Sequence, residues 1–236
     1  QFKVEAQLIN ENPAFNLQDR KLMNAIDFAA NTVVVDGAEY PLTDTVFPTV
    51  DPADPNKFTD QEEEVIAALQ QSFQSSERLK RHIDVLLRKG GMYRICGNDL
   101  VFHACVPLNA DGSLMEADFL GRPLKGKALL DEVDRVVREA FLSKDEEAKK
   151  RGGDLLWYLW LGQGSPLFAK SKMATFEIYY IADKAARKEV KNAFYSLLDD
   201  EMAIDGIFRD FGMDPNRSRI VCGHVPVKVK DGEKPV

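Results

Sequence analysis

The chain has 236 residues, with 31 Lys and Arg against 38 Asp and Glu, which gives a formal net charge of −7. That length fits one large domain or two small ones, and it allows a substantial core without disulfide bonds. The acidic balance argues against a nucleic-acid partner held by net charge. The longest apolar run, Leu155 to Leu161, is far shorter than a membrane span needs, so we expect no membrane partner. Three cysteines without CxxC spacing indicate a reducing, cytoplasmic location.

The two ends of the chain suggest that it is part of something longer. The sequence opens on Gln1 rather than Met, and it lacks the basic-then-apolar pattern of a signal peptide. It stops at Val236, in a tail that contains Gly, Lys and Pro. We therefore expect a piece of a longer protein.

The first 56 residues contain one helical pattern, one hairpin and one irregular connector. Asn16 is predicted to cap a helix that holds Leu22, Met23, Ile26 and Phe28. Asp36-Gly37 lies between two extended runs, and this pair favours a two-residue type I′ hairpin. Residues 48–56 contain three prolines and are predicted to form an irregular connector.

Two helices follow, over about residues 59–75 and 76–88. Thr59 with Glu62 matches the capping-box pattern at the start of the first helix. Apolar residues recur on one face of each helix and are expected to point inward; they are Val65, Ile66, Leu69 and Phe73 in the first, and Leu79, Ile83, Leu86 and Leu87 in the second. Gly90-Gly91 is predicted to end the second helix.

The rest of the chain predicts a mixed α/β (α+β) fold. We expect strands over residues 92–96 and 100–108, helices over 127–142 and about 197–210, and a buried strand over 220–222. Residues 144–151 are expected to be a solvated charge run before a short apolar segment, and residues 162–172 to be a Gly-containing loop.

Histidines are the first candidates for chemistry, because the chain has only three. His82 lies in a charged helical stretch and is expected to face solvent. His103 and His224 each end an apolar run, and Gly223 before His224 allows a sharp turn or a close approach to a ligand. Neutral imidazole is the commonest metal ligand. Two interpretations stay open here: satisfied core histidines, or ligands of a shared metal ion.

Other candidates are weaker. Ser165, Lys170 and Lys172 lie in one Gly-containing loop, which fits either contact with an anion or a solvated surface loop. Cys105 and Cys222 each lie two positions from a strand-end histidine, and buried packing is the expected role of both.

Several unusual sequence words occur together and in a characteristic order. They are Leu79-Lys80-Arg81-His82, Lys89-Gly90-Gly91-Met92-Tyr93, the run from Gly97 through His103 to Pro107, Asp154-Leu155-Leu156-Trp157, Ser165-Pro166-Leu167-Phe168, Met173-Ala174-Thr175-Phe176-Glu177, and Cys222-Gly223-His224-Val225-Pro226. In these words the chain resembles class III fructose-1,6-bisphosphatase from about residue 1 to the end.

The resemblance implies a fold and a domain division. That family belongs to the calcineurin-like metallophosphoesterases, so the expected fold is part of a two-sheet sandwich with added helices. Residues 1–75 would form a hairpin and helical insert region, and residues 76–236 the later part of the metallophosphoesterase domain. Similar words occur in Ser/Thr protein phosphatases of the same superfamily, but there the strand that ends in His leads into Gly-Gly rather than Ala104-Cys105.

The resemblance also implies a two-metal centre, usually of manganese (Mn²⁺), with His103 and His224 as ligands of one ion. The remaining ligands come from Asp-x-His, Gly-Asp-x-x-Asp and Gly-Asn-His motifs, none of which is present. Gly97-Asn98-Asp99 matches the Gly-Asn-His motif only in its first two residues, and Gly153-Asp154 matches only the start of Gly-Asp-x-x-Asp. We expect the complete motifs before Gln1. The catalytic residues beyond the two histidines are therefore unknown, and this chain alone is expected to be inactive.

The expected activity of the whole enzyme is hydrolysis of the 1-phosphate of a sugar bisphosphate, fructose 1,6-bisphosphate, a step of gluconeogenesis. On their charge alone, Lys170, Lys172 and Lys228 are candidates for phosphate contacts. Two alternatives stay open: a protein phosphatase of the same superfamily, and a folded domain without catalysis. A sheet edge left exposed would favour self-association into a homo-oligomer.

Overall fold

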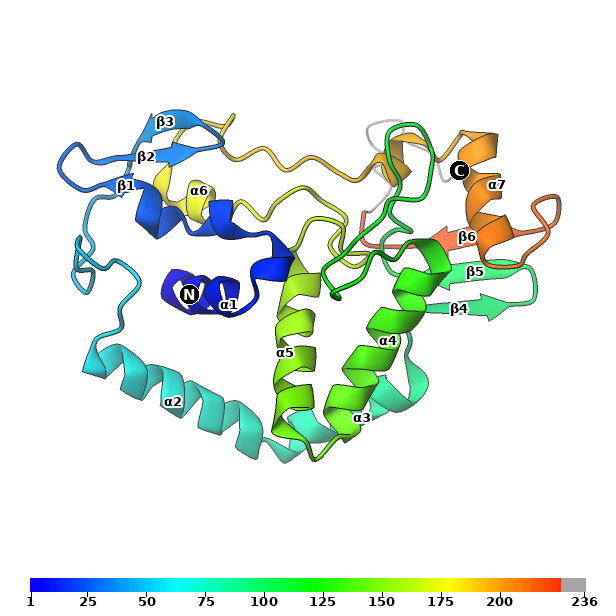
Figure 1. The fold of residues 1–236 in the computed structure, drawn as a ribbon, viewed down its shortest axis with the longest axis horizontal. Helices are drawn as coiled ribbons and strands as arrows, with labels where there is room; N and C mark the ends of the chain where they lie inside the picture. Colours follow the sequence, from blue (N-terminus) through cyan, green and yellow to red (C-terminus); the bar gives the residue numbers. More distant parts are fainter. Residues whose placement is uncertain (226–236) are drawn as a thin grey trace. The chain divides into compact units, whose positions relative to one another are not determined.

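The computed structural model describes residues 1–225. The chain divides into two compact units (Figure 1). The first unit contains residues 1–90 and 174–188, and the second contains residues 91–173 and the chain from residue 189 onward. Within residues 1–225, the helices all lack the length or the apolar character that crossing a membrane requires. Helices and small sheets occur in both units, which confirms the mixed α/β class.

In the first unit a small antiparallel sheet packs against segments that are distant in sequence. The sheet has the order β1 (Ile26–Asp27), β2 (Thr32–Val35), β3 (Ala38–Pro41). Val33 and Val35 of β2 share a core with Leu22, Met23 and Phe176. Phe176 belongs to α6 (Thr175–Tyr180), which lies beside the sheet in Figure 1. The return of the chain over residues 174–188 therefore completes this core.

The hairpin is confirmed where the sequence predicts it. Val35 pairs with Ala38, so that Asp36 and Gly37 form the two-residue turn. Their φ angles are 51° and 79°, and a type I′ turn needs positive φ at both positions.

The prediction of a helix capped by Asn16 is wrong. Asn16 has φ 52° and ψ 44°, a left-handed conformation, whereas a helix N-cap is extended. The helix of this region is α1 (Phe2–Glu11), followed by the short 3-10 turns η1 (Pro13–Phe15), η2 (Gln18–Arg20) and η3 (Leu22–Ala25). Leu22 and Met23 are nevertheless buried, because the 3-10 turn also directs them into the core.

The next two helices begin and end close to the predicted positions. They are α2 (Asp60–Ser75) and α3 (Glu77–Lys89), and the Thr59 capping box is present as predicted. The expectation that their apolar faces are buried is wrong, because neither helix has a buried residue. Val65, Leu69 and Phe73 are 60%, 55% and 64% exposed. Periodicity identifies the apolar face of a helix, but it does not say what packs on that face. The predicted domain boundary after residue 75 falls between these two helices.

Glu62 connects the start of α2 to α1. Its carboxylate accepts hydrogen bonds from Lys3 Nζ at 2.8 Å, from the Thr59 backbone N–H at 2.8 Å and from the Thr49 hydroxyl at 2.7 Å. Burial alone would raise the pKa of Glu62, but the hydrogen bonds from Lys3, Thr59 and Thr49 outweigh it and lower the pKa from 4.5 to about 2.

A lowered pKa makes the first unit sensitive to acid. The stabilisation from ionised Glu62 is present above pH 4.5 and is lost as the pH falls through about 2. We expect it to be on the order of 1–2 kcal/mol, below the full linkage value because the side chain is partly exposed. In Glu62→Gln, the loss of stability between about pH 6 and about pH 3 should be smaller than in the unmodified chain. Urea unfolding at the two pH values measures this.

Glu63→Gln is the matched control, because its side chain is exposed on the neighbouring position of α2. This variant should keep the pH dependence of the unmodified chain. If both variants show the same pH dependence, Glu62 does not have the role described above.

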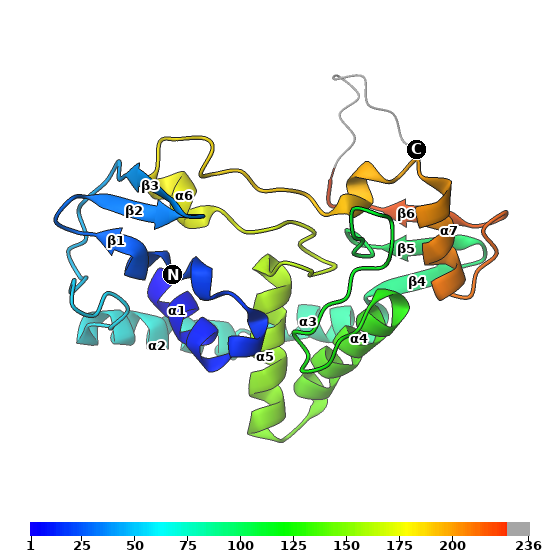
Figure 2. The ribbon, with the colours of Figure 1, turned by 45° about the horizontal axis from the view of Figure 1, so that its top comes forward.

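The second unit contains the other sheet and the longest pair of packed helices. Strands β4 (Tyr93–Cys96), β5 (Asp99–Phe102) and β6 (Arg219–Cys222) lie in that order and are visible side by side in Figures 1 and 2. β4 is antiparallel to β5, and β6 is parallel to β5. The remaining elements are α4 (Gly126–Leu142), α5 (Glu146–Leu161), η4 (Ala193–Ser196) and α7 (Glu201–Asp210).

Two strand predictions for this unit are wrong in part: the strand predicted over residues 100–108 ends at Phe102, and the one over residues 220–222 is not buried. The charge run over residues 144–151 is largely exposed, as predicted. It is helical from Glu146, where α5 begins, and Asp145 caps the helix by accepting hydrogen bonds from the N–H groups of Glu147 and Ala148. The charge run is the exposed first half of a helix whose second half is apolar. The strand over residues 220–222 exists, but Val221 and Cys222 are exposed, because β6 is an edge strand of a three-stranded sheet.

Helices α4 and α5 are joined by three residues and pack closely against each other (Figure 1). The closest approach involves a glycine: a Cβ added to Gly152 would lie 2.0 Å from the Cβ of Ala140. Gly153, the next residue, has no heavy atom within 4 Å of its added Cβ. Gly152 is therefore required by packing, whereas Gly153 is not.

The pair of glycines gives a matched test of this packing. Gly152→Ala should lower the free energy of unfolding by about 1–3 kcal/mol, because the helices must separate to admit the methyl group. Gly153→Ala should raise it by up to about 1 kcal/mol, because alanine favours a helix more than glycine does. Thermal and urea unfolding of the two variants would show opposite signs; equal effects would contradict the close approach at Gly152.

Candidate metal centre

The two strand-end histidines lie together at one edge of the second sheet. β5 and β6 are parallel, and Phe102 is in register with Cys222. Each strand therefore ends at the same edge, and the Gly223 N–H donates to the His103 carbonyl at 2.9 Å. His103 Nε2 lies 3.0 Å from His224 Nδ1, although 121 residues separate them. Both side chains are exposed, so the earlier alternative of buried core histidines is wrong.

The turn that presents His224 is formed by the histidine itself. His224 has φ 62°, in the left-handed region that few residues other than glycine adopt. Gly223 does not have positive φ, and a Cβ there would meet the His103 carbonyl oxygen at an ordinary 3.6 Å. Backbone strain at a non-glycine residue is a feature of functional sites.

The surroundings of His224 favour its neutral form. Partial burial lowers the pKa of His224, and the neighbouring His103 and the Lys170 ammonium lower it further, while a backbone hydrogen bond at Phe168 acts in the opposite direction. Neutral imidazole has a free lone pair, which is the form that binds a metal ion. Because the two ring nitrogens face each other at 3.0 Å, at most one of them carries the proton between them.

Two cysteines lie near the histidine pair. Burial raises the pKa of the Cys105 thiol, and partial burial raises that of Cys222 as well. A raised pKa favours the protonated thiol, which is a poor nucleophile. Cys105 is buried as predicted, whereas Cys222 is exposed.

The histidine pair supplies two candidate metal ligands. Their ring nitrogens lie 3.0 Å apart, which is a hydrogen-bond distance, and imidazole nitrogen is the commonest metal ligand in proteins. Among residues 1–225, however, no group of three or more His, Cys, Asp or Glu side chains could hold an ion. The carboxylates of the two partial motifs are in ion pairs, Asp99 with Arg219 at 2.8 Å and Asp154 with Lys150 at 2.7 Å. The pair fits as two ligands of a larger set.

The loop over residues 162–172 is held in place by Ser165. This side chain is 1% exposed. Its hydroxyl donates to the Leu159 carbonyl at 2.6 Å and accepts from the N–H groups of Leu167 and Phe168. Ser165 is therefore a structural residue. The prediction that its hydroxyl contacts an anion is wrong, because backbone groups already occupy that hydroxyl.

The lysines proposed for phosphate contact have different positions. Lys170 forms an ion pair with Glu189 at 2.6 Å and lines a cavity of about 210 Å³ in the second unit. Lys172 is half-buried and does not line that cavity. Lys228 lies outside the described residues. The cavity also brings in Lys191 and Asn192, which sequence reasoning missed because their pairing with residues 169–171 is not local.

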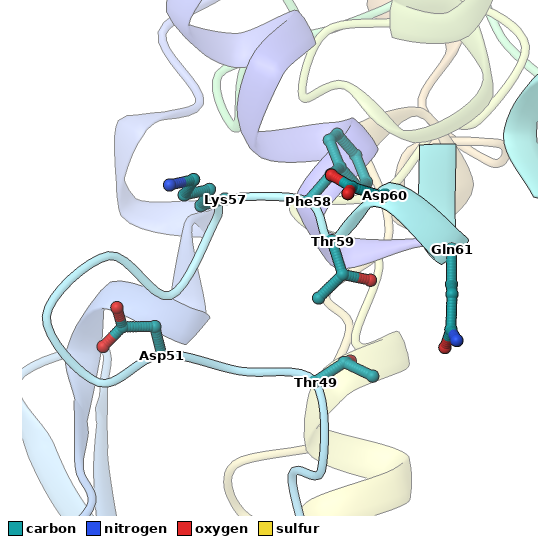
Figure 3. Close-up of a pocket in the computed structure, with 7 residues that line it drawn as sticks. All are labelled: Thr49, Asp51, Lys57, Phe58, Thr59, Asp60 and Gln61. Carbon is teal, nitrogen blue, oxygen red and sulfur yellow. The ribbon is translucent and has the colours of Figure 1, made fainter. Parts of the chain in front are cut away.

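A second cavity, of about 440 Å³, lies in the first unit (Figure 3). Its walls come from one stretch of chain, residues 49–61. Figure 3 shows Lys57 as its cation, with carboxylates at Asp51 and Asp60. An excess of carboxylates opposes the binding of a phosphate ester, so this cavity is not the candidate site.

Comparisons with known proteins identify the family. A family model described as Firmicute fructose-1,6-bisphosphatase matches residues 1–236. The chain therefore belongs to this family. No solved structure matches it.

Curated relatives cover the whole of this chain. A class 3 fructose-1,6-bisphosphatase of Bacteroides fragilis is 48% identical over 237 residues, and those of Fusobacterium nucleatum and Clostridioides difficile are each 44% identical. In each case 100% of this chain is matched. The chain spans only 36–37% of the length of these relatives.

The structural role of Ser165 can be tested directly. Ser165→Ala should lower the free energy of unfolding by about 1–3 kcal/mol, because the change removes a buried hydroxyl and leaves its partners unsatisfied. Ser196→Ala is the control, since that hydroxyl also donates to a backbone carbonyl but is exposed. Urea unfolding should show a clearly larger loss for Ser165; equal losses would contradict its role in the loop.

Proposed function

We propose that this chain is part of a fructose-1,6-bisphosphatase that hydrolyses the 1-phosphate of fructose 1,6-bisphosphate. The observation that carries the proposal is the convergence of His103 and His224 to 3.0 Å at the end of two parallel strands. The match of the whole chain to the family supports it, and the relatives, which are class 3 fructose-1,6-bisphosphatases, favour a sugar bisphosphatase over a protein phosphatase. A non-catalytic domain would not require two exposed imidazoles to face each other.

We propose further that the two histidines are ligands of one ion of a two-metal manganese centre, in a metallophosphoesterase sandwich of which the second sheet is part. His103 and His224 would hold one ion, and the centre would supply activation of a water molecule and stabilisation of the charge that develops on phosphorus. The remaining ligands belong to residues outside the part of the chain described here, as the longer relatives allow.

The residues of this chain contribute position and charge. The parallel ladder fixes the spacing of the two imidazoles, and the surroundings of His224 hold it neutral, ready to bind. The Lys170 ammonium adds positive charge nearby, which favours an anionic phosphate ester. Phosphoryl transfer depends mainly on positioning and on charge stabilisation, so these contributions are the ones the reaction needs.

The proposal includes a cytoplasmic location and a role in gluconeogenesis. Three free cysteines, at positions 96, 105 and 222, suit a reducing compartment. The exposed edge strand β6 supports self-association as a property of the isolated chain.

Substitution of the histidines tests the metal assignment in the full-length protein that contains this chain. His103→Ala and His224→Ala should each weaken manganese binding by more than about tenfold, because even the loss of an outer-shell partner costs 10–100-fold. Bisphosphatase activity should fall with it. Manganese titration of activity, together with metal analysis of the purified variants, measures both effects.

His82→Ala is the matched control, since His82 is exposed on α3. It should leave metal content and activity unchanged. Full activity of both site variants at saturating manganese would overturn the assignment of His103 and His224 as ligands.

A further inference from the structure

The cavity in the second unit has a wall made of two short antiparallel segments, residues 169–171 and 190–192. The Ser171 N–H donates to the Val190 carbonyl and the Asn192 N–H to the Ala169 carbonyl, both at 2.8 Å. Lys170 and Lys191 lie directly opposite each other between these two hydrogen bonds. This is a non-hydrogen-bonded pair, in which the two side chains share a face and approach closely.

Two lysines in that arrangement repel each other. Like charges directly opposite across an antiparallel pair are destabilising. One carboxylate, Glu189, offsets the charge of Lys170. Among residues 1–225, Lys191 has no carboxylate partner, and its ammonium instead lies 5.7 Å from the centre of the Tyr195 ring. The cavity wall thus holds two cations and, within the described chain, no carboxylate.

Asn192 adds a hydrogen-bond donor of fixed direction. Its Oδ1 accepts from the Leu108 and Phe194 N–H groups, each at 3.0 Å. These bonds assign the amide orientation and direct Nδ2 to the Met115 sulfur at 3.7 Å, which is a weak acceptor. Met115 and Leu108 also line the cavity. A ligand oxygen would be a better partner for this N–H group than the thioether is.

We propose that this cavity is an oxyanion subsite, which binds the phosphate group of the sugar bisphosphate that is not cleaved. The inference rests on the proposed function and extends it to substrate selection. Lys191 and Lys170 would pair with the phosphate oxygens, and Asn192 would donate to one of them. A volume of about 210 Å³ suits a phosphate group with part of a sugar, and it is below the usual size of sites for larger ligands.

The cavity lies next to the histidine pair without containing it. The segment of the chain between two cavity-lining residues, Ser165 and Lys170, contacts both histidine turns: the Cys105 N–H, two residues after His103, donates to the Pro166 carbonyl at 3.2 Å, and Phe168 makes a backbone hydrogen bond with His224. A bisphosphate has two anionic ends on one small molecule. One end held in the cavity would place the other toward the imidazoles, which is how a subsite selects a bisphosphate over a monophosphate.

The test compares two substrates in the full-length protein that contains this chain. Fructose 1-phosphate keeps the group that is cleaved and lacks the second phosphate. Lys191→Gln should raise the KM for fructose 1,6-bisphosphate and lower the preference for it over fructose 1-phosphate, measured as the ratio of kcat/KM values, by roughly tenfold. Lys191→Arg, which keeps the charge, should recover most of that preference.

Lys144→Gln is the matched control, because Lys144 is an exposed lysine of the same unit, before α5. It should not change the ratio. An unchanged ratio in Lys191→Gln, or an equal loss on both substrates, would overturn the subsite.

Failure of the proposed function would give a different result. In that case the unmodified protein would hydrolyse neither substrate. Calorimetric titration with inorganic phosphate would then test the subsite independently of activity. Weaker phosphate binding by Lys191→Gln than by Lys144→Gln would support the subsite. Equal phosphate binding by the unmodified protein and both variants, or no phosphate binding by any of them, would overturn it.

Discussion

The parallel pairing of β5 with β6 is the constraint on which the candidate site depends. Parallel strands need a long crossover, and here it runs from His103 to Ser218. The return of the chain to the first unit, the helix pair α4 and α5, and both walls of the cavity all lie within it. Only the register of Phe102 with Cys222 makes His103 and His224 neighbours. A shift of one residue would turn one imidazole to the other face of the sheet.

Local signals in the sequence predicted local structure well. The Asp36-Gly37 turn and the Thr59 capping box each depend on residues at most a few positions apart, and both are present. The two strand-end histidines were found for a similar reason, since each one follows a recognisable apolar run. The family resemblance implied that they bind one ion, and the structure brings their ring nitrogens to 3.0 Å, which could not follow from spacing alone.

What the sequence could not predict depends on distant contacts. The charge run before Asp154 gave no sign that it continues into a helix, because the helix is stabilised by the cap at Asp145 and by packing on α4. The apolar rows of α2 and α3 looked like core faces, although none of their residues is fully buried. Lys191 and Asn192 gave no signal, since their role arises only from pairing with the segment around Lys170.

The second unit thus carries two non-local pairings with complementary chemistry. The β5–β6 ladder brings together two imidazoles, which suit a metal ion, and the short ladder at Lys170 and Lys191 brings together two cations, which suit an anion. Cations beside a metal site usually oppose metal binding, because they repel the ion. The two lysines are compatible with a metal site if the physiological ligand is strongly anionic. A bisphosphate would contact the lysines and the metal ion together, and its negative charge would screen one from the other. After partial burial and the neighbouring His103, the Lys170 ammonium also lowers the pKa of His224, so the charge that is proposed to attract the substrate would also favour the neutral imidazole that a metal ion requires.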